Sequence, residues 1–337
     1  FVFFFFCTRD SVSALAPLAA DGDPAVRQAV RLALENLTGQ PGTEDWSAWL
    51  RSADWAGVEA GLARRLAGAD RDDVRRAAVA LGHVGRGEAA RAALRETLAR
   101  LRDDTAYVAW RKSRQGDNAK FLASDPVNPR AVQEVARAIG RLSDASAVPL
   151  LAETLKRHAD PDAGNLFLAE AAAEALGLIA TREAEAALID TFVQLKPYPK
   201  FTNWYGDHPA LMACHASPVH LRIVEALDAM GATNAPALVP HLIRCVPTDF
   251  DRALFPANDD CETLIGRVIR RQGAEALVSD TCLSVLGEAQ AGRDGDVAAA
   301  LGCVHGAWGG TPDLTNRAAQ VLSLVCRDRR YVPRLQD

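Results

Sequence analysis

The chain has 337 residues, of which 49% are hydrophobic and 24% are charged, as is typical of a globular protein with a sizeable core. A formal charge of −5 excludes attraction of a polyanion by the overall field, so nucleic-acid binding would need a local basic patch. Aromatic residues make up only 6%, while the strong helix formers alanine and leucine dominate. The composition therefore predicts an all-α protein.

Residues 1–10 form an atypical hydrophobic segment. The stretch "FVFFFFC" holds five of the eleven phenylalanines, and its seven residues are far fewer than the roughly 20 that span a bilayer. Bulky Phe5 and Phe6 do not suit a signal-peptide cleavage site. We expect no membrane span here and place the fold in residues 11–337. The segment looks truncated, so an export signal stays an open alternative.

The seven cysteines favour a reducing compartment, such as the cytoplasm. Their number is odd and no C-x-x-C occurs. Cys245, Cys282, Cys303 and Cys326 lie inside apolar helical patterns, where a free cysteine behaves as a small buried hydrophobe.

One helical ending recurs along the chain: an apolar residue, often followed by glycine, and a second apolar residue three positions after the first. The shortest intervals between successive endings are 36 to 38 residues, enough for two helices and two turns. Each ending therefore predicts the close of the second helix of a pair. The paired positions are Leu34 and Leu37, Leu81 and Val84, Ile139 and Leu142, Leu176 and Ile179, Leu227 and Met230, Ile265 and Val268, and Leu301 and Val304.

Aspartate-containing turns precede several of these second helices. They are "DGDPAVRQAV", "DRDDVRRAAV" and "DPDAGNLFLAEAA". Aspartate accepts hydrogen bonds from the free N–H groups of a first helical turn, and Pro24 suits the first helical position. We expect an aspartate cap at each of these starts.

The pattern Asp72, Val74, Arg75, Ala78, Leu81 resembles the second helix of HEAT repeats, and the resemblance extends over residues 11–327. It implies a single domain over 11–337, a right-handed α-solenoid of about seven HEAT-like helical pairs. The chain is also similar to the HEAT-like repeats of phycobilin lyases, although no motif specific to that activity occurs. A shared fold implies no activity by itself.

Longer intervals between endings predict loop insertions near 40–53, 105–128 and 196–216, and a further long loop occupies 247–260. The last three join the two helices of one pair, so we expect them to form a ridge along one edge; 40–53 should lie on the other edge. Large rings concentrate in the insertions and either bind a partner or fold back into the solenoid. They are Trp46, Trp49, Tyr107, Trp110, Tyr198, Trp204 and Tyr205.

The stretch "NWYGDHPALMACHASPVH", residues 203–220, offers metal-ligand atoms without a familiar zinc spacing. Its candidate ligands are His208, Cys214 and His215, but the last two are adjacent and awkward for one ion. His220 belongs to a helix that we expect to start at Pro218. Haem attachment lacks its first cysteine, and no nucleophile motif is recognisable. We therefore predict no cofactor and no catalytic residue.

The sequence favours a non-catalytic scaffold that binds a protein partner as a subunit of a larger assembly. The predicted anchors are Tyr107, Trp110, Trp204 and Tyr205, and the cations that would steer an acidic partner are Arg111 and Lys112. An enzyme, or a cofactor- or metal-binding protein centred on 204–220, is the alternative. Nucleic-acid binding by the loop "WRKSRQGDNAK" is less favoured, because the segment 247–260 is acidic.

Overall fold

The computed structural model describes residues 8–103, 130–160, 165–195 and 218–233, with single positions at 238, 242, 267, 268 and 271. Within these residues every regular element is a helix and no strand occurs, so the all-α prediction is confirmed. The chain divides into two compact units, one of residues 1–158 and 162–181 and the other of 159–161 and 182–337. The single domain over 11–337 stays a prediction.

Eleven α-helices and two short 3₁₀ helices occupy the described residues. The second unit holds α11 (Arg182–Gln194) and α12 (Pro218–Met230). The first unit holds α1 (Arg9–Leu15), η2 (Ala16–Ala20), α2 (Pro24–Thr38), α3 (Trp46–Ser52), α4 (Trp55–Leu66), α5 (Arg71–Val84), α6 (Glu88–Leu101), α8 (Arg130–Arg141), η4 (Ala145–Ala147), α9 (Val148–His158) and α10 (Leu166–Ile179).

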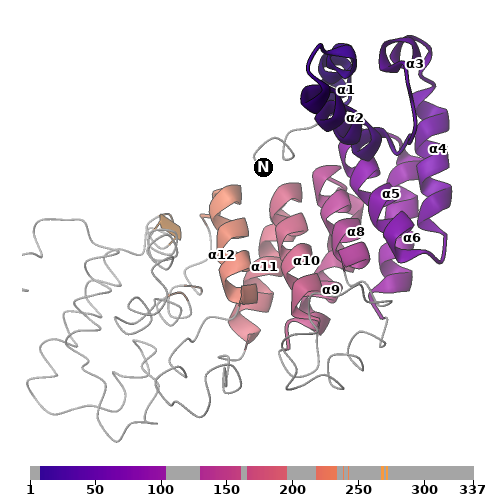
Figure 1. Ribbon diagram of the computed structural model, residues 1–337. Coiled ribbons are helices and arrows are strands. Elements are labelled where there is room, and N and C mark those ends of the chain that lie inside the picture. Colours follow the sequence, from indigo (N-terminus) through magenta and orange to yellow (C-terminus); the bar gives the residue numbers. More distant parts are fainter. Residues whose placement is uncertain are drawn as a thin grey trace, which may run out of the picture. The chain divides into compact units, whose positions relative to one another are not determined.

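The helices of the first unit pack as pairs that contact the next pair. Helix α4 packs on α5, α6 on α8 and α9 on α10. Between pairs, α4 contacts α6, while α2, α5, α8 and α10 contact one another in that order. The second helices of successive pairs thus form a continuous row within this unit (Figure 1).

The recurring sequence ending marks the last turns of helices in both units, as predicted. Five of its seven occurrences fall among the described residues, in α2, α5, α8, α10 and α12. The first apolar residue of each is fully buried: Leu34, Leu81, Ile139, Leu176 and Leu227. The repeat pattern therefore indicates which face of each helix is buried, because a periodic apolar stripe packs against neighbouring helices.

The glycine within the ending permits close contact between neighbouring helices. A Cβ atom on Gly82 of α5 would lie 3.0 Å from Cα of Ala138 in α8. A Cβ atom on Gly140 of α8 would lie 2.6 Å from Cα of Ala175 in α10. In each contact, the alanine lies two residues before the glycine of the recurring ending in its own helix. The same register therefore recurs at two successive helix contacts.

Aspartate capping is confirmed at two helix starts and wrong at a third. Asp23 accepts the N–H of Ala25 and precedes Pro24 at the first position of α2, and Asp70 accepts the N–H of Asp72 in α5. In the stretch "DPDAGN", however, the cap of α10 is Asn165, whose side-chain oxygen accepts the N–H of Leu168 at 3.3 Å. The helix starts later than the aspartates suggest, and asparagine caps as well as aspartate does.

We expect Asn165→Ala to lower the free energy of unfolding by about 1 kcal/mol, because it removes the side-chain oxygen that accepts the Leu168 N–H in the first turn of α10. Urea denaturation measures the loss. Asn36→Ala, at an exposed position of α2, is the matched control and should leave stability nearly unchanged. Equal losses in the two variants would contradict the capping role.

The segment 40–53, expected to be a loop, instead contains helix α3. Asp45 caps it by accepting the N–H of Ala48 at 2.8 Å. Trp46 is only 1% exposed, and its ring meets that of Trp49 edge-on at 5.4 Å, while Trp49 in turn meets Trp55 at 5.5 Å. For Trp46 the structure thus supports the alternative that insertion aromatics fold back into the body, because burying a large ring strongly favours the folded state.

Candidate functional site

The residues that the sequence nominates for function lie outside the described residues. This applies to the partner-binding set, Tyr107, Trp110, Arg111, Lys112, Trp204 and Tyr205, and to the metal candidates His208, Cys214 and His215. What the structure describes is the helices that flank them. Segment 104–129 connects α6 to α8, and segment 196–217 connects α11 to α12.

In the first unit, the first helices of three successive pairs, α4, α6 and α9, end beside one another. Arg100, near the end of α6, donates from Nη2 to the carbonyl oxygen of Leu66, the last residue of α4, at 2.7 Å. Arg102, just after α6, donates from Nη1 to Oε2 of Glu153 in α9 at 2.8 Å. The C-terminal ends of α4, α6 and α9 therefore lie along one side of this unit, which we call the connection edge.

Two arginines and two acids tie the connection edge together. Glu153 contacts both Arg102 and Arg157, and Arg157 pairs with Asp103. The hydrogen bond from Arg102 is the main reason that the pKa of Glu153 lies below its ordinary value, and the charge of Arg157 adds to it. Arg102 has the least exposed side chain of the four residues, and the side chains of the other three are about half exposed. Such pairs contribute little stability, but they orient the chain where segment 104–129 begins.

A buried histidine lies at the same edge. His158, the last residue of α9, is 8% exposed, and its Nδ1 accepts the backbone N–H of Asn165 at 3.3 Å. Burial penalises the imidazolium and lowers the pKa of His158 below its ordinary value. The Arg102 carbonyl and Asp103 act in the opposite direction without reversing the shift.

A second charged cluster runs along the row of second helices. Arg137 of α8 contacts Glu174 of α10 at 2.9 Å and Glu134 of its own helix at 2.9 Å, and Arg141 lies 3.5 Å from Glu134. Burial works against the charge of Arg137, but the two glutamates outweigh it and raise its pKa. Two cations and two anions balance here. This cluster therefore does not supply the unpaired basic surface that a nucleic-acid groove requires.

Sequence reasoning missed this second cluster, although part of it carries a local signal. Glu134 and Arg137 are three residues apart on one helix, the spacing of neighbouring side chains. The contact of Arg137 with Glu174 has no such signal, because 37 residues separate the two.

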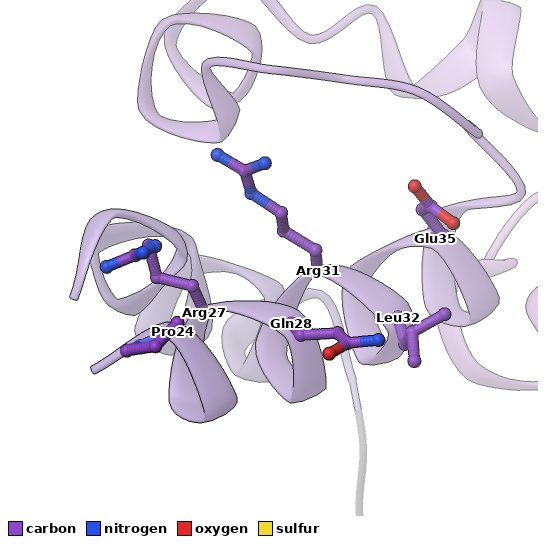
Figure 2. Close-up of a pocket in the computed structure, with 6 residues that line it drawn as sticks. All are labelled: Pro24, Arg27, Gln28, Arg31, Leu32 and Glu35. Atoms are coloured by element: carbon purple, nitrogen blue, oxygen red, sulfur yellow. The ribbon is translucent and has the colours of Figure 1, made fainter. Parts of the chain in front are cut away.

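A surface hollow of about 300 Å³ lies along α2. Figure 2 shows the side chains that line it. Arg27 is held there by the carbonyl oxygens of Asp21 and Gly22, and Glu35 accepts the N–H of Gly42 at 3.1 Å. Every lining side chain comes from this one helix: Pro24, Arg27, Gln28, Arg31, Leu32 and Glu35. A binding site is usually enclosed by several elements, so this hollow does not resemble one.

His220 has a packing role in the second unit. It lies on α12, which begins at Pro218, so both sequence predictions are confirmed. The imidazole is 5% exposed and meets the ring of Phe192 edge-on at 5.5 Å. His220 is thus a buried member of a helix interface rather than part of a polar loop.

Within the part of the chain that the structure describes, no three histidine, cysteine or acidic side chains gather closely enough to hold a metal ion. Among the same residues, no helix has the length and apolar character that a bilayer crossing needs. Models of known protein families give no match to this chain, and neither do the curated proteins.

Proposed function

We propose that the chain is a HEAT-like α-solenoid of about seven helical pairs that acts as a non-catalytic scaffold for a protein partner. The observation that carries the proposal is the repeated contact of glycine with alanine. Gly82 meets Ala138 and Gly140 meets Ala175 in one register. A repeated register between successive second helices is what stacking of equivalent pairs produces.

The residues that precede segment 104–129 support its proposed role in partner binding. Arg102 and Asp103, which directly precede the segment, form ion pairs with residues of α9. A segment whose start is held in place presents Tyr107 and Trp110 with a smaller loss of conformational entropy on binding. Arg111 and Lys112 beside them suit a partner with an acidic surface.

The solenoid arrangement can be tested by small-angle scattering of the full chain. A compact protein of this length has a radius of gyration of about 20 Å. Because a solenoid extends along its axis, we expect a clearly larger value with a maximum dimension to match. A radius of gyration near the compact value would contradict the proposed arrangement.

The partner can be isolated by affinity purification from the native source and its affinity then measured by calorimetry. We expect Trp110→Ala and Trp204→Ala each to weaken binding roughly 30-fold, the effect of removing a central aromatic anchor. Leu18→Ala, at an exposed apolar position outside the insertions, is the control and should bind as wild type does. Unchanged affinity in both tryptophan variants would exclude these insertions as the binding surface.

Metal analysis of the purified protein distinguishes the alternative function. The scaffold proposal expects no stoichiometric metal. A metal bound at one ion per chain, and lost in His208→Ala and Cys214→Ala, would favour an enzyme or metal-binding protein centred on 204–220.

A further inference from the structure

The start of α10 is joined to the end of α9 by a hydrogen bond from a backbone N–H to a buried imidazole. The N–H of Asn165 donates to Nδ1 of His158 over 3.3 Å. Asn165 is itself 5% exposed and caps α10, and its carbonyl oxygen accepts the N–H groups of Leu168 and Ala169. Because a backbone N–H can only donate, this contact requires an imidazole with a free lone pair on Nδ1.

Protonation of this imidazole removes the acceptor. Both nitrogens of an imidazolium carry hydrogen, so the N–H of Asn165 would face another N–H. The new positive charge would also lie at the N-terminus of α10, where the helix dipole is already positive. The contact between Asn165 and His158 is therefore compatible only with neutral His158.

The charged groups around His158 do not stabilise its protonated form enough to offset burial. From the end of α6, Asp103 favours the imidazolium and the Arg102 guanidinium disfavours it. From α9 itself Arg157 disfavours it, while the neighbouring residue at the start of α10, Asn165, is uncharged. Burial outweighs these contributions and lowers the pKa of His158 from 6.5.

We propose that His158 and Asn165 form an acid-sensitive latch, in which protonation of the imidazole releases the start of α10 from the end of α9 and frays the first turn of α10. Opening stays local, because the rest of α10 packs on α8 and α9. This device goes beyond the proposed scaffold function and does not depend on it.

The direction of the pH dependence follows from the lowered pKa. An opened or unfolded His158 takes up a proton near its ordinary pKa of 6.5, whereas the closed state resists protonation to a lower pH. The latch is therefore fully stable above that value. Its stability decreases as the pH falls from 6.5 towards the lower pKa of the closed state.

Native-state hydrogen exchange on the full chain tests the latch at about pH 7.5 and about pH 5. Rates are converted to protection factors, which removes the effect of pH on intrinsic exchange. We expect the amides of Asn165, Leu168 and Ala169 to lose roughly tenfold or more protection at the lower pH. Amides in the middle of α5 should keep theirs.

Two glutamine variants separate a latch from a general effect of acid. In His158→Gln the side-chain oxygen can still accept the Asn165 N–H but does not titrate, so the protection of α10 should become independent of pH. His83→Gln, on α5, should keep the wild-type response. Equal protection of wild type at both pH values, or a loss that persists in His158→Gln, would overturn the proposal.

Should His158→Gln fail to fold, an NMR titration of the wild-type imidazole replaces it. We expect His158 to titrate below 6.5, with the shift of the Asn165 amide following the same curve. An imidazole that titrates at or above its ordinary pKa, or an Asn165 amide that does not follow it, would overturn the latch.

Discussion

Replacement of Glu59 by glutamine is expected to lower the free energy of unfolding by about 3 kcal/mol. Glu59 lies in α4, is 9% exposed and is the shared acceptor for three groups from two other parts of the first unit. Its carboxylate pairs with Arg9 of α1. It also accepts the backbone N–H of Arg86 and of Gly87, each at 3.0 Å, just before α6.

A glutamine cannot serve all three groups. Its side-chain nitrogen is a donor, so one backbone N–H before α6 would lose its acceptor. Arg9 would keep its contact with the Val84 carbonyl oxygen at 2.7 Å and its place over the Trp55 ring at 4.8 Å, but it would lose its counter-charge. An unpaired charge that is mostly buried is costly, so the effect exceeds that of one ordinary hydrogen bond.

Urea denaturation measures the loss of unfolding free energy in Glu59→Gln, with Glu88→Gln as the control. Glu88, the first residue of α6, is likewise a glutamate that pairs with arginine, but its side chain is 68% exposed, and its pairs with Arg91 and Arg95 should contribute less than about 1 kcal/mol. A loss in Glu59→Gln no larger than that in Glu88→Gln would show that Glu59 does not hold α1 and α6 together.

The sequence predicts the helices well because their signals are local. The recurring endings mark buried positions such as Leu81 and Ile139, since a helix that packs on one side repeats its apolar residues within a few positions. Caps such as Asp70 act on N–H groups two or three residues away. The Asn165 cap could also have been chosen, but the sequence "DPDAGN" offers several capping residues and does not rank them.

Contacts between distant residues could not be predicted in this way. Arg9 and Glu59 are 50 residues apart, and Arg95 reaches Asp144 over 49 residues. Either arginine could have paired with many acids of the chain. The candidate binding residues are a further case: composition indicates that large rings concentrate in insertions, but only packing decides whether a ring is buried, as for Trp46. For Tyr107, Trp110, Trp204 and Tyr205 the question stays one for the binding experiment.

Replacement of Gly140 by alanine is expected to destabilise the first unit by about 2 to 3 kcal/mol, although alanine is the better helix former. The added Cβ would lie 2.6 Å from Cα, 3.0 Å from Cβ and 3.1 Å from the carbonyl oxygen of Ala175. These are atoms of a neighbouring helix backbone and its first side-chain carbon, so no rotamer change can relieve the contact. Helices α8 and α10 would have to separate, which weakens the packing around Ile139 and Leu176.

Two further glycine-to-alanine variants serve as matched comparisons. At Gly82 the added Cβ would lie 3.0 Å from Cα of Ala138, so a smaller loss of stability is expected there. At Gly61, within α4, the nearest atom is Nη2 of Arg64 at 4.0 Å, the end of a flexible side chain. Gly61→Ala should therefore stabilise the protein by about 0.5 to 1 kcal/mol through helix propensity alone.

The decisive measurement is the order of the free energies of unfolding of the three variants in urea denaturation. If successive pairs stack in one register, Gly140→Ala and Gly82→Ala change equivalent contacts and must both destabilise, in proportion to how closely the next helix approaches. A stabilising effect at either site would mean that the helices there can move apart without loss, and the repeated contact would then not reflect a common stacking geometry. Losses at both sites with a gain at Gly61 would tie the recurring glycine of the sequence to helix stacking rather than to helix ends.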